Sequence, residues 1–130
     1  MSYDAKIAGN IFSLPGELVS FTAGANITKG QLVKVTGSMT VSPAAAATDP
    51  VIGVAATSAS ANSTVTVIVG HPIVWVTAGG AISAGAAVGS DSSARAVAVT
   101  TAGNRALGFA LEAASAAGDI IRVAVNPHVY

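Results

Sequence analysis

The sequence contains no cysteine among its 130 residues, which excludes disulfides, thiolate nucleophiles and zinc–thiolate sites. Charge is also scarce, because Lys, Arg, Asp and Glu make up 9% of the chain against about 25% in typical soluble domains. Six basic and six acidic residues cancel, so we expect no nucleic-acid partner, since neutralising phosphates requires a basic surface. With so little charge, we expect much of the surface to be covered by other chains.

Long apolar runs and aromatic side chains are scarce too. No run approaches the roughly 18 apolar residues of a membrane helix, and the balanced charge disfavours electrostatic binding to a membrane surface, so no membrane partner is expected. The start, MSYDAKIAGNIFSLPGELVSF, has no basic region followed by an apolar core, and we expect no secretory signal. The hydrophobic residues are mostly Ala and Val, whose small side chains form a thin core that contacts between copies would stabilise.

Short runs of alternating polar and apolar residues are the clearest signal present. Their period of two, with Gly, Pro, Asn, Asp and Ser between them, is typical of half-buried strands. The runs are STVTVIV at 63–69, PIVWVT at 72–77, QLVKVT at 31–36, RAVAVT at 95–100 and DIIRVAV at 119–125. We predict an all-β fold, a small barrel or sandwich of short strands, with one candidate helix at 110–118.

Part of the chain repeats at a spacing of 55 residues. The matches include Ile27 with Ile82, Val33 with Val88, Gly30 with Gly85 and Gly53 with Gly108. This spacing predicts a duplicated β-unit, at 27–70 and 82–126, inside a barrel domain of residues 23–130. Glycine permits a positive φ in a turn and a close backbone approach within a strand. The structural glycines expected on this basis are Gly30, Gly53, Gly85, Gly108 and Gly118.

Residues 1–22 lie outside the repeat and carry much of the large apolar bulk of the chain. Phe12, Leu14 and Phe21 belong to this segment, which Pro15 and Gly16 interrupt. Two interpretations stay open. The segment is either an extended N-terminal arm that reaches a neighbouring chain, or an ordinary edge strand that covers the bottom of the barrel.

No arrangement of residues indicates catalysis, a cofactor or a metal. Asp49 and Asp119 adjoin Pro and Gly and read as turn residues. His71 and His128 lack metal-ligand spacing. The stretch GSDSSA at 89–94 has no GxSxG elbow around its serines, and the chain has no GxGxxG or GxxxxGK phosphate loop. We therefore expect no enzyme, no cofactor and no metal site.

The single Trp is better explained as a packing residue than as a ligand platform. Trp75 lies on a Val-rich alternating strand, and Val65 and Val67 share one face of the preceding strand. We expect these three residues in the core or at a subunit interface.

The order of the motifs resembles the capsid cement, or head decoration, proteins of tailed bacteriophages, over roughly residues 24–126. The matching marks are a Gly turn before a short strand, an IGVA segment, an alternating strand that ends in Gly, an I-x-x-G turn before V-x-x-D, and A-G-D-x-I-x-V. They fall on Gly30, residues 52–55, Gly70, residues 82–91 and residues 117–123. The recombinase-like label that this group often carries does not fit, because the chain has no phosphate loop.

The resemblance implies a β-rich structural protein of the virion, made in the host bacterial cytoplasm and bound to the exterior of the phage head. It implies a major capsid protein as partner, a homotrimer, and a role in stabilising contacts between capsid subunits. The N-terminal segment, through Ile11, Phe12, Leu14 and Pro15, is the candidate capsid contact.

Two rival functions remain open at this point. A carbohydrate- or host-binding β-module would need exposed aromatic side chains, of which the chain has few. A small β-barrel hydrolase or ligand carrier would need a pocket with convergent polar groups, and the sequence indicates none.

Overall fold

The computed structural model describes residues 6–13 and 16–130, which form strands and connecting loops and contain no helix in those ranges. The strands are β1 (Ile11–Ser13), β2 (Glu17–Ala23), β3 (Leu32–Gly37), β4 (Thr40–Pro43), β5 (Val51–Ala55), β6 (Thr64–Val69), β7 (Ile73–Thr77), β8 (Ala87–Ser90), β9 (Ala96–Ala98), β10 (Arg105–Ala110) and β11 (Ile120–Val129). The predicted all-β class is confirmed.

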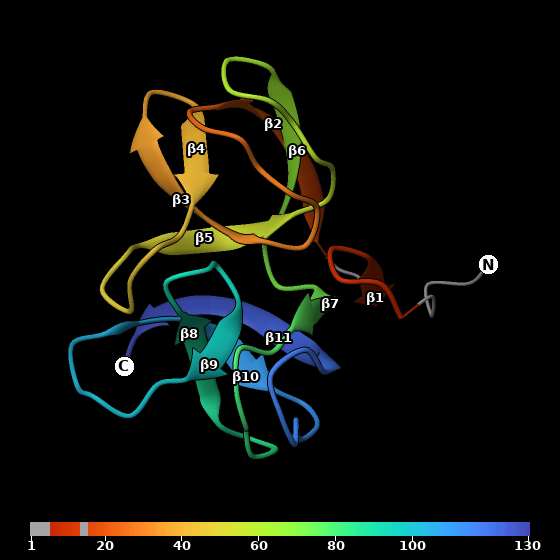
Figure 1. Ribbon diagram of the computed structural model, residues 1–130, viewed down its shortest axis with the longest axis vertical. Coiled ribbons are helices and arrows are strands. Elements are labelled where there is room, and N and C mark those ends of the chain that lie inside the picture. Colours follow the sequence, from red (N-terminus) through yellow and green to blue (C-terminus); the bar gives the residue numbers. More distant parts are fainter. Residues whose placement is uncertain (1–5, 14–15) are drawn as a thin grey trace.

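Strands β2 to β6 form a closed barrel in the upper half of Figure 1, in the order β2-β4-β3-β5-β6. We call this barrel the first unit. All pairs in it are antiparallel except β2 with β4. Its interior is built from small and β-branched side chains, as the alternation along the strands predicts. The buried residues of this interior are Ala23, Ile27, Val33, Val41, Ala55, Val65 and Val67.

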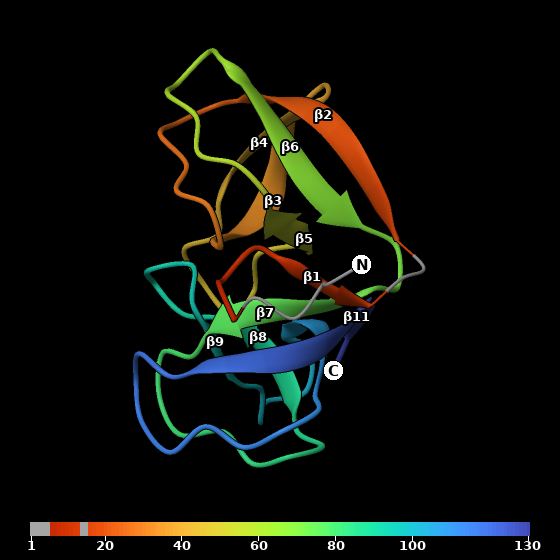
Figure 2. The ribbon, with the colours of Figure 1, turned by 90° about the vertical axis from the view of Figure 1, so that its right-hand side faces the viewer.

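Strands β7 to β11 belong to a six-stranded sheet in the lower half of Figure 1, ordered β1-β7-β11-β10-β8-β9. We call β7 to β11 the second unit. Most of its buried residues join one large cluster with residues of the first unit, so the two units share a continuous core. Figure 2 shows β1 lying next to β7 on the side where the barrel meets the sheet.

The two units have the same pairing order and register. In the first unit, Ile27 bridges Ala59, and in the second Ile82 bridges Ala114, at the spacing of 55 residues seen in the sequence. The equivalence includes β2 and β7, which pair with β6 and β11 in the same way. These matched bridges support our proposal that the chain contains two copies of one β-unit, longer at its start than residues 27 and 82 indicate.

Two glycines inside strands lie against backbone of the neighbouring strand. A Cβ at Gly53 would lie 2.1 Å from the carbonyl oxygen of Ile68, and one at Gly108 would lie 1.9 Å from that of Ala124. No side chain fits there, which agrees with the close approach expected from the sequence. Positive φ angles occur at the turn glycines Gly30 (95°), Gly85 (87°) and Gly118 (94°).

Two expectations about local structure need correction. Residues 110–118 form no helix, because Ala110 ends β10 and Ala114 bridges Ile82 across the second unit. The boundary drawn after residue 22 falls inside β2, a barrel strand whose Phe21 packs against the barrel core. Strand β2 begins at Glu17, directly after Gly16, and pairs with β6 from that residue on, so the part of the N-terminal segment that lies outside the barrel ends before Glu17.

Candidate functional site

The predicted packing residues occupy two different places. Val65 and Val67 are fully buried inside the barrel. Trp75 is 6% exposed and lies on β7 between Val74 and Val76, which point into the shared core. Because neighbouring residues of a strand face opposite sides, Trp75 points away from that core. Its burial therefore comes from other elements.

Trp75 is covered by the N-terminal segment and by β11. The Phe12 ring meets the Trp75 ring edge-on, with centroids 5.7 Å apart, an arrangement that aromatic pairs favour. The Arg122 guanidinium lies 5.1 Å from the Trp75 ring centre and 4.8 Å from that of Phe12. Lys6 lies 5.8 Å from the Trp75 ring centre. We call Lys6, Phe12, Trp75, Glu112 and Arg122 the anchor cluster.

Glu112 orients the arginine of the anchor cluster. Arg122 Nε donates to Glu112 Oε2 at 2.9 Å, and its Nη2 donates to Oε1 at 3.2 Å. The Arg122 hydrogen bond lowers the pKa of Glu112, because it favours the ionised carboxylate. A two-point bond holds the guanidinium plane in place, so Arg122 is positioned to stack on both rings.

Backbone hydrogen bonds fasten β1 to the sheet beside this cluster. The Gly9 N–H donates to the Trp75 carbonyl at 2.8 Å, and the Trp75 N–H donates to the Asn10 carbonyl at 3.0 Å. Ile11 is aligned with Val74 and packs against the shared core. Residues 11–13 thus form an edge strand, but it is the edge strand of the six-stranded sheet and not, as one of the two interpretations had it, of the barrel. Leu14 and Pro15, also named as candidate contacts, lie outside the described residues.

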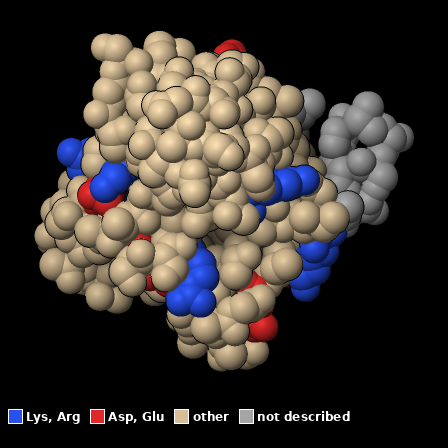
Figure 3. All heavy atoms as spheres, turned by 45° about the horizontal axis from the view of Figure 1, so that its top comes forward, with Lys and Arg blue, Asp and Glu red and all other residues tan. Residues whose placement is uncertain are grey.

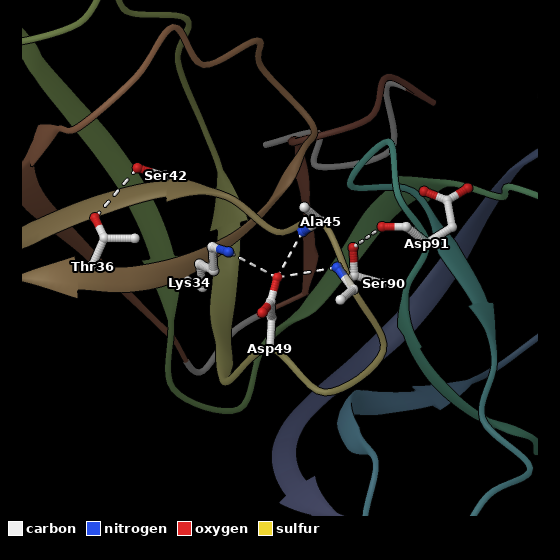
Figure 4. Close-up of polar contacts among 8 residues, drawn as sticks. Lys34, Thr36, Ser42, Ala45, Asp49, Ser90 and Asp91 are labelled. Carbon is white, nitrogen blue, oxygen red and sulfur yellow. Dashed lines mark hydrogen bonds and ion pairs between the residues drawn. The ribbon is translucent and has the colours of Figure 1, made fainter.

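The carboxylates expected in turns hold loops together. Asp49 Oδ2 accepts hydrogen bonds from the backbone N–H groups of Ala45 and Ala46 and from Lys34 Nζ, at 2.8, 3.0 and 2.9 Å (Figure 4). The Ala45 N–H is the main cause of the lowered pKa of Asp49. Asp119 accepts the Ser115 N–H in the same manner. These acids are occupied by structural bonds, which is not the arrangement of a general acid–base pair.

The surface carries few charges. The part of the barrel that faces the viewer in Figure 3 is almost free of Lys, Arg, Asp and Glu, and no large patch of one sign appears on that face. Within residues 6–13 and 16–130, no three His, Asp or Glu side chains gather as they would around a metal ion. Over the same ranges, no helix is both long and apolar enough to cross a membrane.

A family model described as "Phage cement protein" matches residues 14–126, which is most of the chain. The chain belongs to the phage cement protein family. Its role is therefore structural and associated with the phage head, as the resemblance of its motifs implied. The carbohydrate- or host-binding alternative is not favoured.

The fold of this family member is shared with a solved phage structure. The crystal structure of the head fiber gp8.5 N base in bacteriophage phi29 matches with a TM-score of 0.68 and 20% sequence identity, over 86% of this chain and 95% of that chain. At this identity the likeness shows the fold alone. A search of curated proteins finds no match.

Sequence reasoning missed the partners of the aromatic side chains. It placed Trp75 in a core or interface without its contacts to Phe12 and Arg122, and it did not single out Phe109. The Phe109 ring stacks on His128, with centroids 4.9 Å apart and planes at 18°. No local signal marks such contacts, because each joins residues far apart in the sequence.

Proposed function

We propose that this protein is a non-enzymatic cement protein, which binds the outer surface of the assembled phage head and stabilises contacts between major capsid protein subunits. Membership of the phage cement protein family over residues 14–126 carries this proposal. Support comes from the sparse, scattered charge and from carboxylates that hold loops rather than converge on a pocket. A protein that binds only the assembled form stabilises it by mass action.

We further propose that the protein acts as a homotrimer. Three copies joined together would engage three sites on the head at once, so weak individual contacts would give strong overall attachment. The low charge supports close packing of copies around a symmetry axis, because little electrostatic repulsion opposes it.

The proposed capsid contact is the N-terminal segment around Ile11 and Phe12. Strand β1 is the last strand of its sheet, and an edge strand offers backbone groups to an extended partner segment. Exposed Ile7 adds apolar area next to it. The anchor cluster would present this segment in one fixed orientation, which reduces the entropy lost on binding.

Co-sedimentation with phage heads tests the proposal. The purified protein should bind mature, expanded heads that lack decoration, with saturation at a number of copies that fits their three-fold sites. It should not bind unexpanded procapsids. Absence of binding to both particles would refute the proposed function for that phage.

A deletion variant tests the proposed capsid contact of the N-terminal segment separately from the proposed cement function. A chain without residues 2–13 should keep its barrel, since β2 to β6 close without β1, and should bind expanded heads more weakly. Circular dichroism would verify that the variant is folded. Unchanged binding would remove the N-terminal segment from the contact and leave the cement function in place.

A further inference from the structure

A cleft lies between the two units near the C-terminal end of β11. It has a volume of about 230 Å³, and residues on or next to β5, β10 and β11 line it. We call it the joint cleft. Strand β11 continues through residues 126–129, whereas β6, the equivalent strand of the first unit, ends at Val69, which corresponds to Val125. The end of β11 is therefore an addition to the repeated unit, and this addition forms part of the cleft.

The walls of the joint cleft are mostly apolar, and Arg105 is the residue on them with a permanent charge. The apolar walls include Pro50 and Ile52 from the first unit and Pro127 and Val129 from the second. Arg105 is aligned with Val129 across the β10–β11 pair, so these two side chains share one face of the sheet. His128 is aligned with Ala106 and points to the opposite face, where its ring stacks on Phe109.

Arg105 forms no ion pair with any residue in the ranges 6–13 and 16–130. The ion pairs found there are Lys34 with Asp49, Arg95 with Asp91, and Arg122 with Glu112. Asp49, which precedes Pro50 of the cleft, is thus already bonded to Lys34 Nζ at 2.9 Å. The described residues that line the cleft include no acidic side chain. The cleft therefore presents an uncompensated guanidinium beside apolar walls, and such walls strengthen the attraction for a carboxylate.

We propose that the joint cleft receives an acidic side chain, flanked by apolar residues, from a segment of the major capsid protein. The acid would pair with Arg105, whose planar guanidinium can bind both oxygens of a carboxylate. The apolar neighbours of the acid would pack on Ile52 and Val129. The volume is below the roughly 300–1,000 Å³ of small-molecule sites, which favours a few side chains of a protein segment.

This inference rests on the proposed binding to heads and names the chemistry of a second contact there. The joint cleft is built from β5, β10 and β11, and none of its lining residues belongs to the N-terminal segment proposed as the first contact. The two contacts can therefore be removed one at a time. If they act independently, their effects on binding should combine when Arg105→Gln is added to the chain that lacks residues 2–13.

Co-sedimentation of the full-length chain with expanded heads that lack decoration tests the joint cleft. Arg105→Gln should weaken binding roughly tenfold, as expected for loss of a charge pair at an interface. Arg105→Lys, which keeps the charge but not the two-point geometry, should lose less. Added salt should weaken the binding of the parent more than that of Arg105→Gln, because salt screens the charge pair that the variant lacks.

A second variant blocks the cleft without changing Arg105. Val129→Asp places a carboxylate directly across from Arg105 on the neighbouring strand, where it would pair with the guanidinium, and it should weaken binding about as much as Arg105→Gln. Met39→Asp is the matched control, because Met39 is 59% exposed against 57% for Val129 and lies in the turn between β3 and β4. It changes the net charge equally, away from the cleft, and should bind as the parent does.

Circular dichroism would verify that each variant is folded. Binding of Arg105→Gln that equals the parent's, with the same salt dependence, would overturn the proposal and leave the cement function in place. Equal weakening by Met39→Asp and Val129→Asp would also overturn it, because overall charge would then be the cause. If Arg105→Gln instead alters only self-association in sedimentation equilibrium, the cleft belongs to a contact between copies and the proposal is wrong. A parent protein that binds no heads refutes the proposed function and this inference with it.

Discussion

The two units share one pairing order, yet the first is a closed barrel and the second is an open sheet. In the first unit, β2 pairs with β4 at Thr22 and Ala23. In the second unit, the equivalent contact between β7 and β9 shrinks to a single bridge, Ala78 with Ala96. Strand β1 has no counterpart in the first unit and takes the free edge of β7. In the first unit, the free edge of β2 is hydrogen-bonded to β4 of the same unit. In the second unit, the corresponding edge of β7 is hydrogen-bonded to the added strand β1.

The two units also differ in the side chains at the positions next to this edge. The cross-strand pair Trp75 and Arg122 of the second unit corresponds to Ser20 and Thr66 in the first. Large side chains occur where β1 must be held, and small polar ones occur where no strand is added. Two units with the same strand pattern therefore form different structures, one a closed barrel and the other a sheet with an added strand. The difference follows the residues that face outward.

The largest effect is expected at Leu32, Val54 and Ile68, which are fully buried in the core that the two units share. Ile68→Ala should lower the free energy of unfolding by about 2–5 kcal/mol, because it leaves a cavity between the units. Urea denaturation followed by circular dichroism would measure the loss. Leu18→Ala is the control, since Leu18 is aligned with Ile68 on the adjacent strand but is 60% exposed, and it should change stability by no more than about 0.5 kcal/mol. Equal losses would show that the units do not depend on this packing.

A smaller effect is expected where β1 joins the second unit. Phe12→Ala should release the edge contact with Trp75 and cost about 1 kcal/mol. Trp75 is the only Trp, so its fluorescence reports on this site directly. We expect a red-shifted emission and easier quenching by acrylamide, because water would reach the indole. Ile7→Ala, at a neighbouring exposed residue, should leave the emission unchanged, and an unchanged emission in Phe12→Ala would contradict the role assigned to the anchor cluster.

The smallest effect is a difference in pH dependence between the units. Glu112 Oε2 accepts the Arg122 N–H, and in the equivalent place of the first unit Thr57 Oγ1 accepts the Thr66 N–H. The pKa of Glu112 is lowered from 4.5 by its bonds to Arg122. A lowered folded-state pKa means that the stabilisation is complete above about pH 4.5 and is lost as the pH falls through the folded value.

Glu112→Gln should therefore lose under about 1 kcal/mol of stability at neutral pH, and this loss should vanish at low pH. Thr57→Val should cost the same at both pH values, because no charge is involved. Unfolding midpoints at pH 7 and below pH 4 would compare the two variants. The contribution of Asp49, whose pKa is also lowered, is common to both and cancels in the comparison. A constant deficit in Glu112→Gln would show that the charge of Glu112 contributes nothing.

Much of the fold was predictable because it is encoded in local patterns. Alternating runs predicted β6, β7 and β11. The repeated Ile and Gly positions predicted a duplicated β-unit, and the structure adds the bridges Ile27–Ala59 and Ile82–Ala114, which recur at the same spacing. The helix expected at 110–118 does not form, because the helix propensity of Ala is a weak preference that tertiary contacts override, and Ala114 bridges Ile82 across the unit. The surroundings of Trp75 were only partly predictable. The Val-rich run indicated a core or interface position, but the partners Phe12 and Arg122 come from β1 and β11.

The sequence alone determined the all-β class, the repeated pattern and the scarcity of charged and catalytic groups, because periodicity, spacing and composition are properties of the linear chain. Only the tertiary structure decided which unit closes, where β1 attaches and which side chains cover the aromatic rings. These outcomes depend on strand edges and side chains that lie far apart in the chain, such as Phe12 with Trp75 and Phe109 with His128. Such contacts form when distant strands pair, and no local residue pattern specifies that pairing.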